Sequence, residues 1–264
     1  MDLQKAISIT GVTVGIGPVY EELARLAACC FEQWTGAPAL VLGARELASS
    51  QVDHPAGLRL QVFDYTSADI VVYFDADWFC LGPWSPPIDH ATSAVFACRD
   101  FVLTSEWPRQ QYEFDSPAFL DGPVDAAVSD QPIGLRQDYV DEVRRFADLS
   151  SPPTQWINTG LMVLRRSAHV ALLSTALENY QSIVGHHPEY FEQPAFNRAI
   201  ETLGVPCRLL ARKFNVLAAR PTKWPAAVVG LHIKPKRHEE FLGAIRERTI
   251  TTPDDVRRYF CEAK

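Results

Sequence analysis

The chain has 264 residues, of which 47% are hydrophobic and 22% are charged, and its formal net charge is −7. This length and composition are typical of one large globular domain, or two small ones, with a core of ordinary proportions. The negative charge argues against a broad basic surface of the kind that attracts nucleic acid or anionic membranes, so an anionic ligand would need local positive charge or a metal ion.

The first hundred residues predict alternating strands and helices. A strand pattern at 6–14 leads through a Gly-Ile-Gly-Pro turn into a helix at 19–33, whose apolar residues share one face. A strand at 39–42 and a helix or loop region up to Arg59 follow. Apolar runs then predict a strand that ends at Asp75 and another strand at 94–98.

Residues 99–156 interrupt this alternation. They are rich in proline, aspartate and aromatic residues, show no clear period and are too many for an ordinary connection. Their aromatic side chains favour an ordered excursion that faces a substrate over a disordered one.

The alternation then resumes. The patterns predict a strand at 161–165, helices at 168–184 and from Gln193, a strand at 226–233, and C-terminal helices within 237–264 with Thr252 as an N-cap. We therefore predict an α/β fold with a mostly parallel central sheet flanked by helices, in a single domain over residues 1–264.

The chain carries no pattern of a signal peptide or of a membrane span. Its first residues lead directly into a strand pattern, and no apolar run reaches the roughly 18 residues of a spanning helix. The six cysteines are scattered through apolar segments, which favours buried thiols over a disulfide framework or a zinc site. We expect a cytoplasmic protein.

Two carboxylates stand at the end of a predicted strand, in Asp75-Ala76-Asp77. Residues i and i+2 of an extended segment point the same way, and ligand sites in open α/β sheets lie beyond the carboxyl ends of strands. Both carboxylates could therefore face one hard divalent cation, which prefers oxygen ligands. A solvated turn that carries two acids is the alternative.

Further polar motifs occur near the ends of other predicted elements. They are Arg59 upstream of that strand, Asn158-Thr159-Gly160 before an apolar run, Glu192-Gln193 at a helix start, Phe214-Asn215 before the last strand and His232-Ile233-Lys234 at its end. Each motif has an ordinary alternative. A surface arginine, a turn, an acid at a helix N-terminus and a structural histidine would look the same.

The order of these motifs resembles that of retaining glycosyltransferases of the glycogenin type, which are family 8-like and have the GT-A fold. The resemblance runs from about residue 6 to residue 237. It implies a metal-dependent hexosyltransferase that moves a sugar from a nucleotide-sugar donor, with a UDP-sugar favoured, to an acceptor with retention. The acceptor, a carbohydrate, a protein or a small molecule, is not specified, and residues 99–156 would lie on its side. No nucleic acid is implied as a partner.

The resemblance also implies roles for individual residues. The metal ligands would be Asp75, Asp77 and His232, and the metal Mn²⁺ or Mg²⁺. The catalytic residues, at the sugar, would be Asn158, Glu192 and Gln193. Donor binding would use Thr10 and Tyr20 at the base, Asp75, Ala76 and Asp77 at the metal, and Gly160 at the sugar. Arg59 would meet the diphosphate or the sugar, and Lys234 the diphosphate.

Three departures from the family pattern stand out. The family has lysine where this chain has Arg59, and aspartate where it has Glu192. The spacing between His232 and Lys234 is also shorter than usual. It leaves open whether Lys234, Lys236 or Arg237 would contact the diphosphate.

Two other functions stay open. A sugar-phosphate nucleotidyltransferase would carry a glycine-rich loop followed by a basic residue after its first strand, but here Gly17 precedes Pro18-Val19. A catalytically silent nucleotide-sugar-binding protein on the same fold is the second alternative. The presence of Asp75, Asp77 and His232 counts against it.

Overall fold

A computed structural model describes residues 7–88, 93–99, 157–184, 192–218, 223–233 and 238–261. The predicted excursion lies outside these residues from position 100 onward, as do Lys234, Lys236 and Arg237. The expectations for them stay predictions.

The elements before the excursion follow the predicted alternation. They are β1 (Ile9–Val14), α1 (Pro18–Thr35), β2 (Ala39–Leu42), α2 (Ala44–Ala48), η1 (Pro55–Gln61), α3 (Val62–Tyr65), β3 (Ile70–Phe74), β4 (Trp78–Cys80) and β5 (Val95–Arg99). Helix α1 begins at Pro18, whose fixed φ suits the first helical position, and ends before Gly36 at φ 73°, where glycine carries no Cβ penalty.

The elements after the excursion complete the described fold. They are β6 (Ile157–Arg165), α7 (Arg166–Val184), α8 (Glu192–Leu203), β7 (Cys207–Leu209), η3 (Arg212–Phe214), β8 (Val216–Ala218), β9 (Gly230–Ile233), α9 (Glu239–Arg246) and α10 (Pro253–Phe260). Thr252 caps α10 as predicted, since its hydroxyl accepts a hydrogen bond from the backbone N–H of Asp255.

The central sheet has the strand order β2-β1-β3-β6-β5-β7. Strands β1, β2 and β3 are parallel, β5 and β7 are parallel, and β6 runs antiparallel to both of its neighbours, β3 and β5. The predicted α/β fold with a mostly parallel sheet flanked by helices is therefore confirmed.

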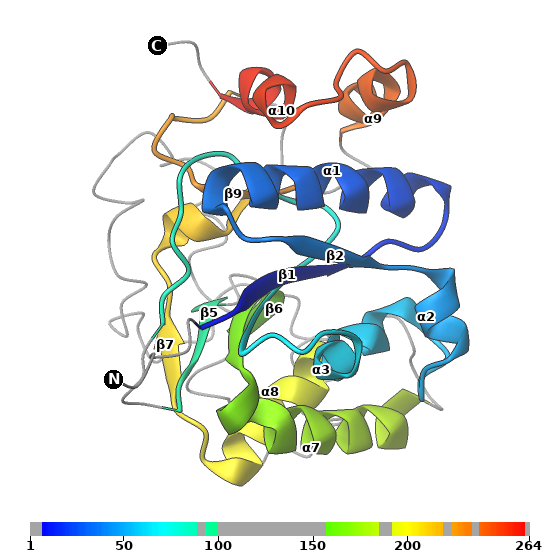
Figure 1. The fold of residues 1–264 in the computed structure, drawn as a ribbon, viewed down its shortest axis with the longest axis vertical. Coiled ribbons are helices and arrows are strands. Elements are labelled where there is room, and N and C mark those ends of the chain that lie inside the picture. The colour runs from blue at the N-terminus through cyan, green and yellow to red at the C-terminus, as the bar shows by residue number, and fades with distance from the viewer. Residues whose placement is uncertain are drawn as a thin grey trace, which may run out of the picture.

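Helices cover both faces of this sheet. Helix α1 lies on one face, with α9 and α10 beyond it, and α7 and α8 lie on the other (Figure 1). Residues of β3 alternate between the two cores, with Val72 and Phe74 facing α1 and with Val71 and Tyr73 facing α7 and η1. Tyr73 thus points to the face from which η1 and α8 bring their polar residues.

A second sheet, with the order β4-β9-β8, lies beside the end of β3. Strand β9 pairs antiparallel with β4, with His232 opposite Trp78, and parallel with β8. The strands of this second sheet have only three or four residues, too few to show a hydrophobic period in the sequence. The predicted strand at 226–233 is confined to Gly230–Ile233.

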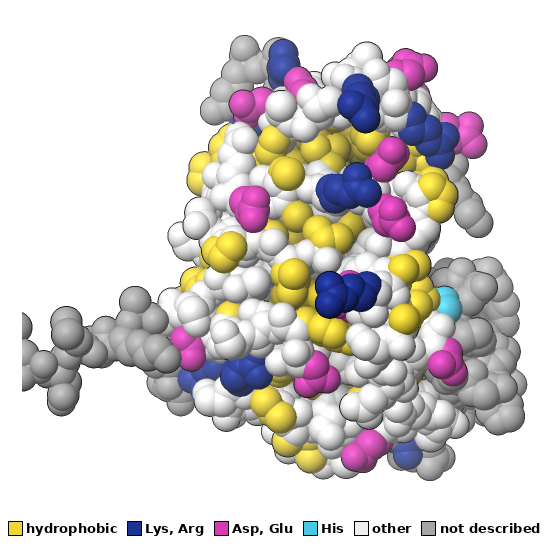
Figure 2. Space-filling model, turned by 45° about the vertical axis from the view of Figure 1, so that its right-hand side comes forward, with side chains coloured by type: hydrophobic (Ala, Val, Ile, Leu, Met, Phe, Trp, Pro, Cys, Tyr) yellow, Lys and Arg dark blue, Asp and Glu magenta, His cyan; other side chains and the backbone are white. Residues whose placement is uncertain are grey.

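The molecular surface mixes charges of both signs. On the face in Figure 2, Lys and Arg side chains are interspersed with Asp and Glu side chains among apolar ones, and no basic field forms there. Among the described residues, no helix combines the length and the hydropathy that crossing a membrane requires.

Candidate functional site

Three side chains with metal-binding atoms converge beyond the end of β3. Asp75 and Asp77 lie on the turn between β3 and β4, and His232 lies on β9. His232 Nε2 is 3.1 Å from Asp77 Oδ1 and 3.7 Å from Asp75 Oδ2. One possible ligand atom from each residue lies within 4.8 Å of the other two.

The convergence depends on a turn and not on an extended segment, which corrects the geometry predicted from the sequence. The carbonyl oxygen of Asp75 accepts a 3.0 Å hydrogen bond from the N–H of Trp78, which closes the turn. The carbonyl oxygen of Asp77 accepts a 2.9 Å bond from the N–H of Ile233, which brings β9 beside it. The small second sheet thus supplies the histidine.

The side chains at this place fit a divalent cation. Two carboxylates and an imidazole form a donor set that suits Mn²⁺ or Mg²⁺. A Cβ atom at Gly160 would lie 2.8 Å from Asp75 Oδ2 and 2.9 Å from His232 Cε1, so glycine leaves room between the ligand atoms. Burial lowers the pKa of His232, but Asp77 and Asp75 outweigh burial and raise it, so the cluster favours positive charge.

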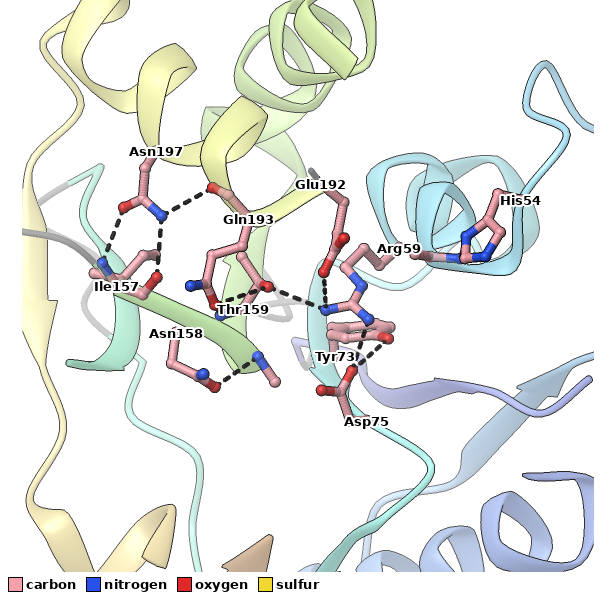
Figure 3. A network of polar contacts seen from close by, with 12 residues as sticks. His54, Arg59, Tyr73, Asp75, Ile157, Asn158, Thr159, Glu192, Gln193 and Asn197 are labelled. Carbon is pink, nitrogen blue, oxygen red and sulfur yellow. Dashed lines mark hydrogen bonds and ion pairs between the residues drawn. The ribbon is translucent and has the colours of Figure 1, made fainter. Parts of the chain in front are cut away.

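Arg59 connects this cluster to α8 (Figure 3). Its Nη2 lies 3.0 Å from Asp75 Oδ1, and its Nη1 lies 3.1 Å from Glu192 Oε1 and 3.0 Å from the hydroxyl of Thr159. The guanidinium also lies over the ring of Tyr73, at 5.0 Å from the centroid. Arg59 is thus bound on several sides by protein groups and is not a solvated surface arginine.

Two polar groups around Arg59 show the effects of burial. Glu192 is 8% exposed, and its Oε2 has no hydrogen-bond partner among the described residues. Burial raises the pKa of Glu192, and Arg59 opposes this rise. Burial also raises the pKa of Tyr73 well above its usual range, so its hydroxyl is a proton donor to Asp75 Oδ1 at 2.9 Å.

The Asn158-Thr159-Gly160 segment belongs to β6 itself, which begins at Ile157 and not at 161 as predicted. Asn158 Oδ1 accepts hydrogen bonds from the N–H of Gly160, at 2.9 Å, and from Asn215 Nδ2, at 3.0 Å. Because both partners are donors, these two bonds identify which side-chain atom of Asn158 is the oxygen. The NH₂ group of Asn158 therefore points away from Gly160 and Asn215. The sequence motif named Asn215 but did not predict that its side chain orients Asn158.

Gln193 and Asn197 hold this segment from α8. The side-chain oxygen of Gln193 accepts a 3.1 Å bond from the N–H of Thr159. The Asn197 amide bonds to both the N–H and the carbonyl oxygen of Ile157, as a neighbouring strand would. The side-chain amide oxygen of Gln193 is therefore directed to the backbone of β6, and not away from it.

The donor-binding residues expected at the N-terminus divide into two cases. Tyr20 lies in the first turn of α1, after the end of β1, and is 45% exposed. Thr10 pairs with Val71, four residues before Asp75, which is about 13 Å along the strand. The structure therefore does not place Thr10 beside the metal cluster, and its contact with the nucleotide base stays a prediction. Strand β1 continues to Val14, so the end of β1 and the turn that follows it lie beside Asp75.

Neither models of known protein families nor curated protein sequences match this chain. Solved structures do resemble it. The bifunctional glycosyltransferase WbbM, in its apo form, matches with a TM-score of 0.59 and 12% identity over 97% of this chain and 52% of its own. The galactosyltransferase LgtC, in complex with donor and acceptor sugar analogs, matches with a TM-score of 0.54 and 13% identity over 94% of this chain and 99% of its own.

The chain has the GT-A fold. Its structural neighbours are glycosyltransferases of this fold, but identities of 12–13% extend the likeness no further than the fold. The chain spans about half the length of the WbbM chain that it matches.

Proposed function

We propose that this chain is a metal-dependent glycosyltransferase of the hexosyltransferase class, with a nucleotide-sugar donor, a UDP-sugar by preference. The observation that carries the proposal is the Asp75, Asp77 and His232 cluster at the carboxyl edge of a GT-A sheet. Retention at the anomeric carbon and the family 8-like assignment rest on the order of the sequence motifs. The single-domain organisation is likewise a proposal.

The proposed reaction needs negative charge stabilised on a departing nucleoside diphosphate. A divalent cation held by Asp75, Asp77 and His232 would supply this as a Lewis acid, worth several kcal/mol. Lys234, which follows β9 directly in sequence, is proposed to add positive charge there. It lies outside the described residues, so its contribution rests on the motif alone.

The transferred sugar gains positive charge as the diphosphate departs. The buried carboxylate of Glu192 can stabilise that charge, since its Oε2 is not engaged by another described residue. Asn158 offers amide donors to sugar hydroxyls, because Gly160 and Asn215 occupy its oxygen. Arg59 stays protonated beside Asp75 and Glu192, since those carboxylates outweigh burial and raise its pKa.

In this proposal, Gln193 holds the backbone of β6 in place. Its side-chain Oε1 accepts the hydrogen bond from the N–H of Thr159, which positions Asn158 on one side and Gly160 on the other. Its contribution at the anomeric carbon is proposed from the sequence motif. The excursion after residue 99, proposed to form the acceptor side, rests on sequence alone as well.

The proposal is tested by calorimetric titration of the full chain with Mn²⁺ and UDP. Asp75→Asn and Asp77→Asn each remove an anionic ligand with little change of shape. We expect each to weaken Mn²⁺-dependent UDP binding by more than about a hundredfold, since changes to groups that merely support a ligand already cost about 10–100-fold. Asp64→Asn is the matched control, because Asp64 is an exposed carboxylate on α3.

A panel of nucleotide sugars, scored for Mn²⁺-dependent hydrolysis, then separates the remaining functions. A transferase hydrolyses at least one donor slowly without an acceptor. A silent binding protein binds UDP with Mn²⁺ but hydrolyses no donor. A nucleotidyltransferase instead joins a sugar phosphate to a nucleoside triphosphate and releases pyrophosphate. Wild-type UDP affinity in both aspartate variants contradicts the metal site itself.

A further inference from the structure

The two oxygens of the Asp75 carboxylate lie in different surroundings. Oδ1 accepts a 2.9 Å hydrogen bond from the Tyr73 hydroxyl and lies 3.0 Å from Arg59 Nη2. Oδ2 lies 3.7 Å from His232 Nε2, over the space that glycine leaves at position 160. Two donors therefore engage one oxygen, and the other faces the rest of the cluster.

Tyr73 reaches Asp75 because the two residues are separated by one position at the end of β3. Residues i and i+2 of a strand share a face, so the Tyr73 ring stands on the side from which η1 brings Arg59. The ring is 1% exposed, and the Arg59 guanidinium lies against it, 5.0 Å from its centroid. Packing thus leaves the hydroxyl little freedom to turn away from Asp75.

This arrangement restricts how Asp75 can bind a cation. A carboxylate that is free to rotate can offer one oxygen or both, and Ca²⁺ accepts both readily within its shell of six to eight oxygens. With Oδ1 engaged by Tyr73 and Arg59, Asp75 has Oδ2 alone to offer. One oxygen per carboxylate suits a smaller ion with octahedral geometry better than it suits Ca²⁺.

We propose that Tyr73 is a positioning residue of the metal site, whose hydroxyl holds Asp75 Oδ1 so that Oδ2 alone faces the cation. This inference rests on the proposed function, because it takes Asp75, Asp77 and His232 to hold a divalent cation. It adds a residue that the sequence presents as one more apolar position in a buried strand. It also assigns to that residue an effect on which cation is preferred.

The test is Tyr73→Phe in the full chain, with Tyr65→Phe as the matched control. Tyr65 also donates one hydroxyl hydrogen bond, at 3.2 Å to the carbonyl oxygen of Glu46, but it lies on α3 and is not part of the cluster. Mn²⁺ and Ca²⁺ dissociation constants are measured for each variant by titration. Free Mn²⁺ is followed by its electron paramagnetic resonance signal, and thermal unfolding is measured in EDTA.

Tyr73→Phe should raise the Mn²⁺ dissociation constant about tenfold, at the lower end of the usual effect because Arg59 still engages Oδ1. It should raise the Ca²⁺ constant less, so that the preference for Mn²⁺ over Ca²⁺ narrows. Tyr65→Phe should leave both constants unchanged. A merely structural role for Tyr73 would change the unfolding temperature in EDTA without changing this preference.

Two results would overturn the inference. If the wild type binds Mn²⁺ and Tyr73→Phe keeps both the affinity and the preference, Tyr73 does not position Asp75, while the proposed function stands. If the wild type binds no Mn²⁺ at all, the proposed metal-dependent function and the inference fall together.

Discussion

Nη1 of Arg59 lies 3.1 Å from Oε1 of Glu192, where η1 meets the first residue of α8. The two side chains are only 12% and 10% exposed. The same guanidinium lies 3.0 Å from Asp75. The single positive charge of Arg59 is therefore shared by two carboxylates that are largely buried. Removing one partner of such a pair is far more destabilising than removing both, because it leaves a buried charge uncompensated.

We predict that Arg59→Lys destabilises the protein although it keeps the charge. A lysine ammonium is a compact point charge and cannot reach Asp75, Glu192 and Thr159 together as the planar fork does. Losing one hydrogen bond to a charged group should lower the free energy of unfolding by about 1.5–3 kcal/mol. Arg59→Met should lower it by about 3–5 kcal/mol, measured by urea unfolding in EDTA.

Arg25→Lys is the control for this pair of variants. Arg25 lies 3.7 Å from Glu21 on α1, and its side chain is 69% exposed, so the change should cost less than about 0.5 kcal/mol. Equal effects of Arg59→Lys and Arg25→Lys would mean that the fork geometry of Arg59 contributes nothing to stability.

A second prediction concerns the glycine beneath the metal cluster. Gly160→Ala places a methyl group against Asp75 Oδ2 and His232 Cε1, so these ligand atoms have to move apart. Mn²⁺ affinity should fall by at least about tenfold, while the free energy of unfolding falls by about 1–3 kcal/mol from overpacking. Calorimetric titration and urea unfolding measure the two effects separately.

Gly243→Ala on α9 is the matched glycine control. No atom lies within 4 Å of a Cβ at this position, so alanine should stabilise the helix by up to about 1 kcal/mol and leave Mn²⁺ binding unchanged. A Gly160→Ala variant that keeps wild-type Mn²⁺ affinity would show that the space above Gly160 is not part of the cation site.

The sequence predicted the alternating architecture because long apolar periods mark its helices and central strands. It missed the start of β6, since Asn and Gly within four residues are typical of a turn. The paired strand β5 and the Asn197 amide, which bonds both backbone groups of Ile157, keep that segment extended. Both partners act over long sequence separations, so no local pattern could reveal them.

The sequence predicted which residues form the candidate site better than it predicted how they are arranged. The ligand types at Asp75, Asp77 and His232 follow from the motif order, whereas their convergence depends on a turn and on β9, whose short strand has no readable period. Thr10 was matched to a family position around the nucleotide base, whereas β1 continues four residues beyond it to Val14. Tyr73 carried no polar signal, because a tyrosine in an apolar strand is typical of a core.

His169 provides a third prediction, away from the site. It lies near the start of α7 and is 1% exposed. Its Nδ1 accepts a 2.8 Å hydrogen bond from the N–H of Arg165, and its Nε2 lies 2.9 Å from the carbonyl oxygen of Ser93. Because a carbonyl oxygen only accepts, Nε2 carries the proton and the ring is neutral.

Protonating His169 would place a second proton on Nδ1 and break its bond with Arg165. Burial lowers the pKa of His169, the bond to Ser93 opposes this, and Arg165 adds to the lowering. The unfolded chain, with an ordinary histidine pKa of about 6.5, therefore binds more protons than the folded chain just below that pH. Stability should fall as the pH drops through about 6.5 toward the lower folded pKa, and no such loss should occur above it.

We predict that His169→Gln weakens this acid sensitivity, since glutamine can donate and accept without titrating. The free energy of unfolding is measured by urea titration from pH 8 to pH 5 for both proteins. Wild type should be the more stable at pH 8, where its ring is neutral and well packed, and its advantage should shrink as the pH falls below about 6.5. Parallel curves for the two proteins across this range would show that the folded chain accommodates a charged ring at position 169.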